Sequence, residues 1–405
     1  MAMKRLCYFI ISTLFLCVFN YTSGAKNNDF KILKENGIPV ALNPDHPIPS
    51  KSSPKDIIFN EVLTIGQAEG DPSYVFSEHI SFTVDDKGNI YILDLREKTL
   101  RKFDSKGKHL LSFGREGQGP GEFTSPEKVM LLSNGHLMVF EGESQKFSCF
   151  TQEGKFVNSG KFLKLMSPPY FGFSNGNFIA KSVQRNSHKT VVITGVFNTK
   201  SELLAQLYKR EMEPYKPWPS QDDSDSRVKR IAEVWSKIAF RPQTIMALDS
   251  MENIYFAFTD KYEMKIFSPD AQLKRLIRTG LQMLPVKKKD RDGYLNYWLP
   301  KDISSWNLMS QKFKNKIKSL IKFPEKKPAF LSIIPMDKDY LMTVREGSFN
   351  QNSLIDIFDP SGRFIIEKRL RFHIKEGFCR GGIFYTIYED EEGNQFVKCY
   401  KYELK

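Results

Sequence analysis

The chain has 405 residues, of which 40% are hydrophobic and 13% aromatic, so it can bury a large core. Its 60 basic and 47 acidic residues give a net charge of +13, and its five cysteines are too few for a disulfide-stabilised scaffold. Much of the positive charge lies in one segment, between residues 286 and 327, which argues against an all-over nucleic-acid-binding surface.

Residues 1–25 have the layout of a secretory signal peptide. Lys4 and Arg5 precede an apolar run from Leu6 to Phe19, and the small residues Ser23-Gly24-Ala25 offer a cleavage site. The run is short for a membrane span, and an uncleaved anchor is the alternative. The sequence therefore predicts a secreted or periplasmic protein.

Removal of the signal peptide would leave three cysteines, Cys149, Cys379 and Cys399. Cys17 does not predict a lipoprotein, because Leu16 stands where a lipid-attachment site needs a small residue. Cys379 and Cys399 fall close together near the C-terminus and could form one disulfide. Two buried thiols are an equally acceptable alternative.

Residues 26–56 are polar and contain five prolines, so we expect an extended N-terminal lead-in rather than a domain. Ile57–Ile65 then forms a predicted strand that has no repeat unit in front of it. Propellers are closed, radially repeated sheets. We expect this strand to complete the last unit and close the ring.

The stretch 80–126 shows the repeat most clearly. Four short apolar runs are separated by turn residues: Ile80–Val84, Ile90–Leu93, Leu100–Phe103 and Leu110–Phe113. Runs of this kind between Asp, Gly and Asn turns are typical of an antiparallel meander. The turn between the third and fourth runs follows Phe103. In later units the equivalent turn also follows a phenylalanine: Phe150, Phe197, Phe267 and Phe358.

A four-strand unit that repeats about every 40–50 residues indicates the blades of a β-propeller. Six blades are expected, at 80–118, 127–163, 168–210, 243–278, 328–371 and 373–405, the last completed by 57–65. The predicted fold class is therefore all-β, a six-bladed propeller over 57–405. Two partly helical insertions interrupt it, at 211–241 and 281–327.

The insertions contain all four tryptophans, Trp218, Trp235, Trp298 and Trp306. Tryptophan is enriched at binding hot spots, so these side chains are candidates for partner binding. The alternative is that they pack the insertions onto the propeller. Each insertion also shows apolar residues at helical spacing, around Trp235 in the first and around Phe313 and Ile317 in the second.

The second insertion is strongly basic. Between Val286 and Lys327 there are 12 basic and 4 acidic residues, a net charge of +8. Lysines that lie mostly off the apolar helix face are candidates for binding an acidic partner or an anionic membrane surface: Lys312, Lys314, Lys316 and Lys318. A solvated helix face is the alternative.

With GREGQGPGEF at Gly114–Phe123 and DDKGNIYILD before it at Asp85–Asp94, the chain resembles the NHL-type six-bladed propellers. More narrowly, it is similar to secreted bacterial six-bladed propeller proteins. The resemblance covers 57–405 outside the insertions, and it specifies the fold better than the function. It implies that the chain could bind a protein or RNA, or act as a lyase or lactonase with a metal on the axis.

Residues at the start of the inner strands would face the propeller axis. Alignment of the units places His79, Lys128, Gln243 and His373 there. A divalent ion needs three or four suitable ligands, so we expect neither a metal nor another cofactor. The G-x-S-x-G and H-E-x-x-H motifs do not occur, and no catalytic residue is predicted.

Together these features predict a non-enzymatic recognition propeller that binds a protein or glycan of the cell envelope. An anionic membrane surface is a further possible partner, nucleic acid is not expected, and the protein is expected to be a monomer. The alternative function is a lyase- or lactonase-type enzyme that acts at the axial pocket.

Overall fold

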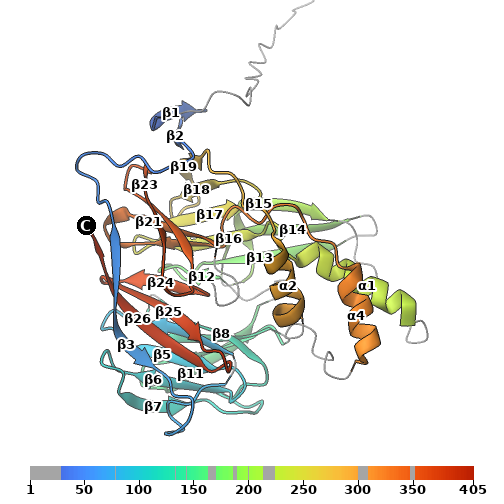
Figure 1. Ribbon diagram of the computed structural model, residues 1–405. Helices are drawn as coiled ribbons and strands as arrows, with labels where there is room; N and C mark the ends of the chain where they lie inside the picture. Colours follow the sequence, from blue (N-terminus) through green and yellow to red (C-terminus); the bar gives the residue numbers. More distant parts are fainter. Residues whose placement is uncertain are drawn as a thin grey trace, which may run out of the picture.

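The structure is a computed structural model. It describes residues 29–405 except 78, 133, 143, 163–169, 186–188, 199, 213–223, 300–308 and 347–351. The described strands form a six-bladed β-propeller, which is the predicted fold class (Figure 1). The proposed signal peptide lies outside the described residues.

The first three blades follow the chain in order. Blade one consists of β4 (Ile80–Val84), β5 (Ile90–Asp94), β6 (Thr99–Phe103) and β7 (His109–Phe113). Blade two consists of β8 (Pro126–Leu131), β9 (Leu137–Glu141), β10 (Lys146–Phe150) and β11 (Phe156–Lys161). Blade three consists of β12 (Phe171–Gly172), β13 (Phe178–Arg185), β14 (Thr190–Phe197) and β15 (Leu203–Met212).

The remaining three blades follow the insertions. Blade four consists of β16 (Thr244–Leu248), β17 (Ile254–Phe258), β18 (Glu263–Phe267) and β19 (Leu273–Thr279). Blade five consists of β20 (Ser332–Pro335), β21 (Leu341–Glu346), β22 (Leu354–Phe358) and β23 (Phe364–Arg369), with a short 3₁₀ turn, η3 (Asp337–Asp339). Blade six consists of β24 (Gly377–Arg380), β25 (Ile383–Glu389), β26 (Gln395–Leu404) and β3 (Ile57–Ile65).

Blade six is completed by a strand from the other end of the chain. β3 pairs antiparallel with β26, from Ile57 opposite Leu404 to Ile65 opposite Val397. Ile57 and Ile65 are both fully buried at the two ends of this pairing. The ring is therefore held shut by backbone hydrogen bonds between the N-terminal and C-terminal parts of the chain, in the position that the sequence predicts.

Part of the N-terminal lead-in is more regular than the sequence predicts, because it forms two strands that join the propeller. β1 (Lys31–Glu35) and β2 (Ile38–Asn43) form a hairpin, and β2 pairs in parallel with β19. The hairpin thus adds two strands to the outer edge of blade four. Val40 and Ala41 of β2 are buried where it pairs with β19. Burial of these apolar side chains stabilises the pairing, although the rest of the lead-in is polar.

The same segment continues past blade five. Asn43 accepts a hydrogen bond from the backbone N–H of Phe364 (2.7 Å) and donates one to the carbonyl of Gly362 (2.9 Å). Further along, the Asp56 carboxylate accepts from the Lys368 ammonium at 2.5 Å. Residues 30–56, here called the strap, therefore connect blades four and five before the chain enters blade six as β3. Figure 1 shows the strap in blue.

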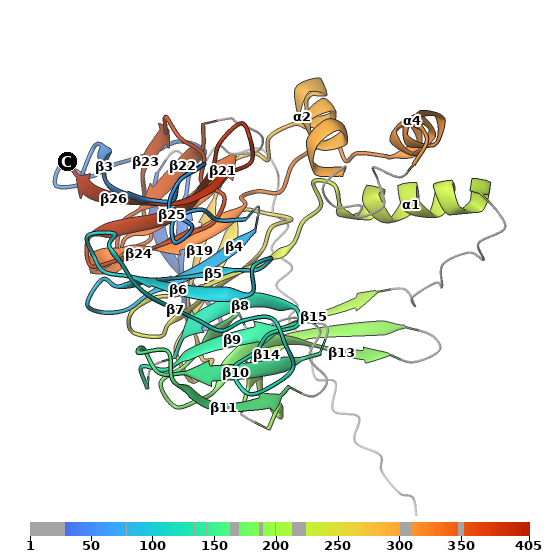
Figure 2. The ribbon, with the colours of Figure 1, turned by 90° about the horizontal axis from the view of Figure 1, so that it is seen from below.

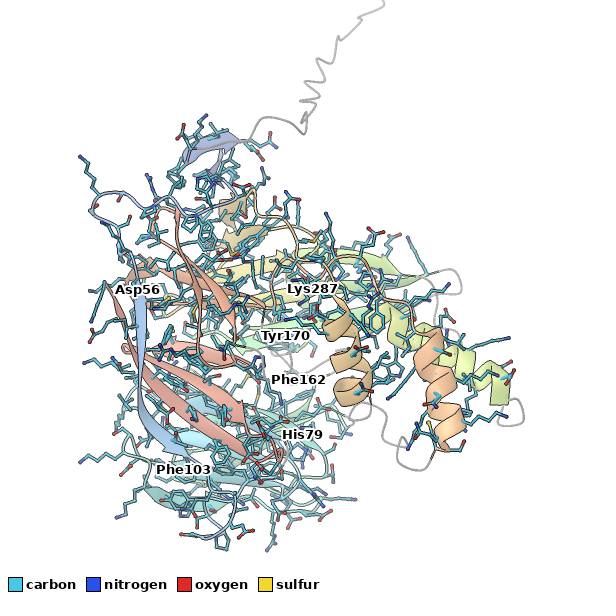
Figure 3. The ribbon with its side chains drawn as sticks, viewed as in Figure 1. Asp56, His79, Phe103, Phe162, Tyr170 and Lys287 are labelled. Carbon is cyan, nitrogen blue, oxygen red and sulfur yellow. The ribbon has the colours of Figure 1, made fainter. Side chains whose placement is uncertain are left out.

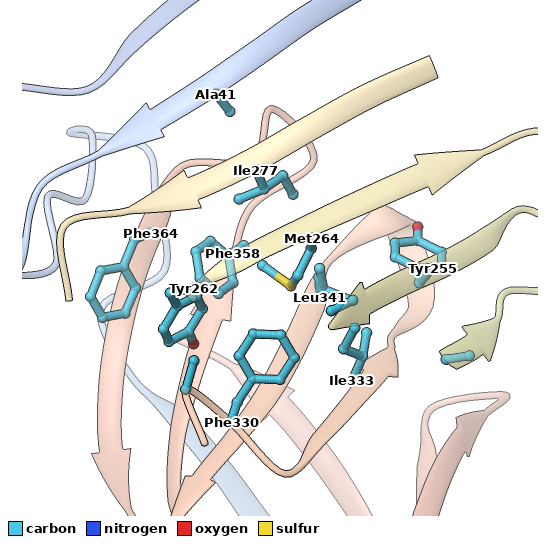
Figure 4. Packing of buried hydrophobic residues seen from close by; sticks show 13 residues of the cluster. Ala41, Tyr255, Tyr262, Met264, Ile277, Phe330, Ile333, Leu341, Phe358 and Phe364 are labelled. Carbon is cyan, nitrogen blue, oxygen red and sulfur yellow. The ribbon is translucent and has the colours of Figure 1, made fainter. Parts of the chain in front are cut away.

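Apolar clusters fill the spaces between neighbouring blades. Figure 4 shows one of them, in which Tyr262 and Met264 from blade four meet Phe330, Leu341 and Phe358 of the next unit. Ala41 of the strap belongs to the same cluster. The strap is thus part of the core between blades four and five.

Turns within the blades are held by side chains that accept backbone N–H groups. In blade one the Asp85 carboxylate accepts from the N–H groups of Lys87 and Asn89, each at 2.9 Å, and from the Tyr91 hydroxyl. The same set recurs around Asp249 in blade four. Asp and Asn fit these turns because their short side chains can bond backbone groups two residues on.

The outer turns need a residue in the left-handed region. Gly107 has φ 82° in blade one, whereas Ser201 and Ala271 have φ 62° at the equivalent positions in blades three and four. A side chain in this conformation costs roughly 1–2 kcal/mol relative to the right-handed region. The later blades therefore keep the turn without the glycine that makes it easy to recognise.

Among the described residues, Cys149, Cys379 and Cys399 are free thiols and do not pair. Cys379 lies on β24 and Cys399 on β26, and β25 runs between these two strands. Neighbouring strands are about 4.8 Å apart, so the two Cα atoms are about 10 Å apart, beyond the reach of a disulfide. The alternative of separate thiols is the one that the structure contains.

Candidate binding face

On one face of the ring, the outer strand of each blade ends and the inner strand of the next blade begins. The chain passes from one to the other at 66–79, 114–125, 162–170, 213–243, 280–331 and 370–376. We call this the connection face, and the opposite one the turn face. In Figure 3, His79 and Tyr170 lie toward the connection face, whereas Phe103 lies toward the turn face.

Lys128, near the start of the inner strand β8, is half-buried on the connection face. Its ammonium donates a hydrogen bond to the carbonyl oxygen of Tyr170 (3.0 Å) and lies 5.4 Å from the centre of the Phe171 ring. Burial lowers the pKa of Lys128, and the negative charge of Glu376 in blade six opposes this effect. The amine of blade two is thus close to groups from blades three and six.

His373 reaches the connection face in the segment that leads into β24. Its Nδ1 is buried and has no hydrogen-bond partner among the described residues. Burial lowers the pKa of His373, the nearby Lys375 lowers it further, and Glu389 raises it. The imidazole is therefore uncharged near pH 7.

The other two predicted axial residues, His79 and Gln243, are exposed. Their backbones are fixed by neighbouring strands: Gln243 donates its N–H to the Thr259 hydroxyl (3.0 Å), and the His79 carbonyl accepts from Leu95 (3.1 Å). Only Lys128 and His373 among the four predicted residues hold buried polar groups.

Two buried carboxylates next to this face accept hydrogen bonds from loop groups. Asp94 accepts from the N–H of Ser77 (2.9 Å) and from its hydroxyl (2.6 Å). Glu141 accepts from the Thr124 hydroxyl (2.9 Å) and from the N–H of Ser125 (3.0 Å). These carboxylates hold the segments that enter blades one and two. The second oxygen of Glu141 has no hydrogen-bond partner among the described residues and lies 3.6 Å from the Lys146 ammonium.

The two insertions meet in one helical unit that rises from the connection face. It contains α1 (Ser224–Ile238), α2 (Lys288–Gly293), the π-helix η1 (Tyr294–Trp298) and α4 (Gln311–Leu320). Figures 1 and 2 place α1, α2 and α4 together on one side of the blades. The unit has an apolar core of its own, whose buried members are Val228, Ile231, Ala232, Leu299, Ile317 and Ile321.

The predicted tryptophans are only partly within the described residues. Trp235 is half-buried and packs against the core of the helical unit, which is made of insertion residues and not of propeller strands. Trp298 is the last residue of η1. Trp218 and Trp306 lie outside the described residues.

The four predicted lysines on α4 differ in their surroundings. Lys316 pairs with Asp225 of α1 at 2.6 Å, and the ammonium of Lys318 donates to the side chain of Asn296 at 2.8 Å. Lys312 is exposed and Lys314 is half-buried. At least two of the four lysines therefore help to join the helices of the unit, a role that helical spacing did not reveal.

The base of the helical unit is fixed by a buried ion pair. The Lys327 ammonium lies 2.9 Å from the Asp290 carboxylate, with side chains only 7% and 0% exposed. The Asp290 carboxylate also accepts a hydrogen bond from the backbone N–H of Lys287 (2.8 Å), the residue that precedes α2. We call the Asp290–Lys327 pair the clasp, because it joins the two ends of the second insertion.

Sequence reasoning missed three partners at this face: Tyr170 and Glu376 beside Lys128, and Asp225 beside Lys316. Each comes from a distant part of the chain, so no local spacing could have indicated it. Within the described ranges there is no group of three or more His, Cys, Asp or Glu residues placed to hold a metal ion. The same part of the chain contains no helix long and apolar enough to cross a membrane.

Neither the protein-family models nor the curated proteins include a match to this sequence. Solved structures do match. A protein named as exported from Bacteroides fragilis NCTC 9343 has a TM-score of 0.50 at 9% identity, covering 90% of this chain and 99% of that one. A DUF4221 family member from Bacteroides vulgatus has a TM-score of 0.48 at 7% identity, covering 87% and 100%. At such low identities the similarity concerns the fold alone, and the resemblance to NHL repeats stays a prediction.

Proposed function

We propose that this chain is a non-enzymatic recognition propeller that binds an anionic protein or glycan of the cell envelope through its connection face. The observation that carries the proposal is the helical unit. Two insertions from different positions in the chain meet there around a common core, on the face that also holds the axial residues. Rigid scaffolds commonly mount binding elements in this way.

The charge of the helical unit supports an anionic partner. Residues 286–327 carry a net charge of +8. The clasp and the Lys316–Asp225 pair neutralise two of the lysines internally. Exposed positive residues remain on the unit, among them Lys288, Lys312, Lys322 and Lys326. Such a surface attracts an anionic partner and speeds its association.

The test compares two quadruple variants of the full protein. The first replaces Lys288, Lys312, Lys322 and Lys326 of the helical unit with Gln. The second makes the same change in charge at exposed lysines near the turn face: Lys87, Lys106, Lys155 and Lys274. Heparin serves as the anionic glycan probe and poly-glutamate as the acidic protein probe.

We expect the helical-unit variant to lose about tenfold in affinity for at least one probe, about 1.4 kcal/mol, and to show a flatter dependence on salt. The turn-face variant should lose less than about twofold, because charges separated by more than a Debye length of about 10 Å are largely screened. Equal losses in the two variants would mean that only the net charge matters, and would overturn the proposal.

A further inference from the structure

Lys128 has an unusual environment for a partly buried amine. Its ammonium has one hydrogen-bond acceptor, the Tyr170 carbonyl, and no carboxylate of the described residues lies within 4.0 Å. Burial of an unpaired ammonium costs several kcal/mol. A neutral carbonyl and the face of the Phe171 ring offset only part of this cost.

The segment 370–376 also holds a buried polar atom that has no hydrogen-bond partner among the described residues. His373 and Glu376 belong to the same segment, 370–376, and the charge of Glu376 acts on Lys128. The Nδ1 of His373 is buried and unpaired among the described residues. Buried polar atoms without a protein partner are uncommon, and each calls for an explanation such as a ligand.

We propose that the connection-face end of the propeller axis is a binding site for an anionic oxygen group, a carboxylate, phosphate or sulfate, with Lys128 as its charged anchor. An anion beside Lys128 would supply the missing counter-charge. His373, uncharged near pH 7, could donate or accept a hydrogen bond from the neighbouring segment. Glu376 is exposed, so its negative charge lowers the affinity of the site for an anion but its side chain does not fill the site.

This site differs from the helical unit in residues and in position along the chain. It can exist whether or not the basic surface of the unit binds a partner. The experiments are therefore separate: the one above removes lysines of the unit, and those below keep the unit unchanged.

The chain provides a matched control for Lys128. Lys102, on β6 of blade one, also donates to one carbonyl, that of Gln152 at 3.0 Å, and also lies 5.4 Å from the centre of an aromatic ring, that of Tyr91. The two lysines share these neighbours, but Lys102 lies away from the connections that form the proposed site.

The first experiment measures the reactivity of each lysine in the full protein by trace labelling with isotopic acetic anhydride and peptide mass spectrometry. A bound anion keeps the Lys128 amine protonated and covered. For an anion with a Kd of about 1 mM, a concentration of about 10 mM should slow the labelling of Lys128 about tenfold by mass action. Lys102 should be unaffected.

Phosphate, sulfate and malonate are tested separately against sodium chloride at matched ionic strength. Protection by phosphate and sulfate alone would assign a tetrahedral oxyanion, whereas protection by malonate alone would assign a carboxylate. If none of the three protects Lys128 more than Lys102, the proposal is wrong.

The second experiment measures the rise in Tm that the protecting anion causes. Lys128→Met should abolish the rise, and Lys128→Arg should retain it because the guanidinium keeps the charge. Glu376→Gln should enlarge the rise, since it removes the opposing charge, and Lys102→Met should leave it unchanged. A rise of the same size in Lys128→Met and the native protein would contradict the proposal. If Lys128→Met does not fold, an unchanged rise in Glu376→Gln would contradict it equally.

Discussion

The propeller ring and the helical unit are held together in different ways. In the ring, each blade repeats the same strand pairings and turns, and apolar clusters fill the spaces between blades. The helical unit has one small core and a few polar contacts between its helices, among them the clasp, the Lys316–Asp225 pair and the Lys318–Asn296 hydrogen bond. Loss of a contact in one blade leaves the equivalent contacts of the other blades in place, whereas the helical unit does not repeat its contacts.

The largest effect is expected from opening the ring. Deletion of 26–66 removes both the strap and β3, so blade six would keep three strands and expose the edge of β26. We expect the loss of cooperative unfolding or a very large fall in Tm, measured by calorimetry. Deletion of 26–50 alone, which leaves β3 in place, should cause a smaller fall. If both deletions melt like the native protein, closure by β3 does not stabilise the ring.

The next largest effect is expected from breaking the clasp, which should destabilise the helical unit and not the ring. Lys327→Met leaves the Asp290 carboxylate buried without its counter-charge, which typically costs 3–5 kcal/mol. Hydrogen exchange should therefore show opening of α2 and α4 with little change in the blades. The double variant Asp290→Asn/Lys327→Met should recover part of the loss.

Lys316→Met is the matched control, because it breaks an exposed ion pair in the same unit. The side chains of Lys316 and Asp225 are 44% and 63% exposed, so their pair contributes at most about 1 kcal/mol. A loss in Lys327→Met no larger than in Lys316→Met would show that burial of the clasp has no effect on stability.

The ring could be predicted from sequence because its determinants are local and repeated. Asp85 and Asn89, or Phe103 and Gly107, are close in sequence and recur in later blades. The strap was missed because β2 pairs with β19, more than 200 residues away, and its own composition is polar. Lys128 was found by alignment of the repeat, but its partners Tyr170 and Glu376 follow from the closed ring, which brings three blades together.

A third prediction concerns a buried network between blades four and five. The Tyr262 hydroxyl donates to Asp356 at 2.5 Å, and Arg345 lies 2.9 Å from the same carboxylate oxygen while also pairing with Glu367. Burial raises the pKa of Asp356 to about 6, although Arg345, Tyr262 and Thr343 act in the opposite direction.

Because the pKa in the folded state is above the ordinary value of 3.8, Asp356 favours folding most below about pH 4 and least above about pH 6. The difference of about 2 pH units corresponds to about 3 kcal/mol. Urea unfolding of the native protein should therefore include a loss of stability between pH 4 and pH 6 that Asp356→Asn lacks. Parallel pH profiles for the two proteins would contradict the assignment.

The smallest effect is expected within the ring, at a turn where one blade departs from the others. Ser201 occupies the outer turn of blade three with φ 62°, where blade one has Gly107 at φ 82°. Glycine adopts this region without the steric cost of a Cβ atom, so Ser201→Gly should stabilise the protein by about 1 kcal/mol, measured by urea unfolding. The reverse change, Gly107→Ser, should destabilise it by more, because a Cβ atom there would lie 2.7 Å from the Leu63 side chain of β3. If Ser201→Gly lowers stability instead, the turn of blade three depends on the serine side chain, and the equivalence of the two blades fails at this position.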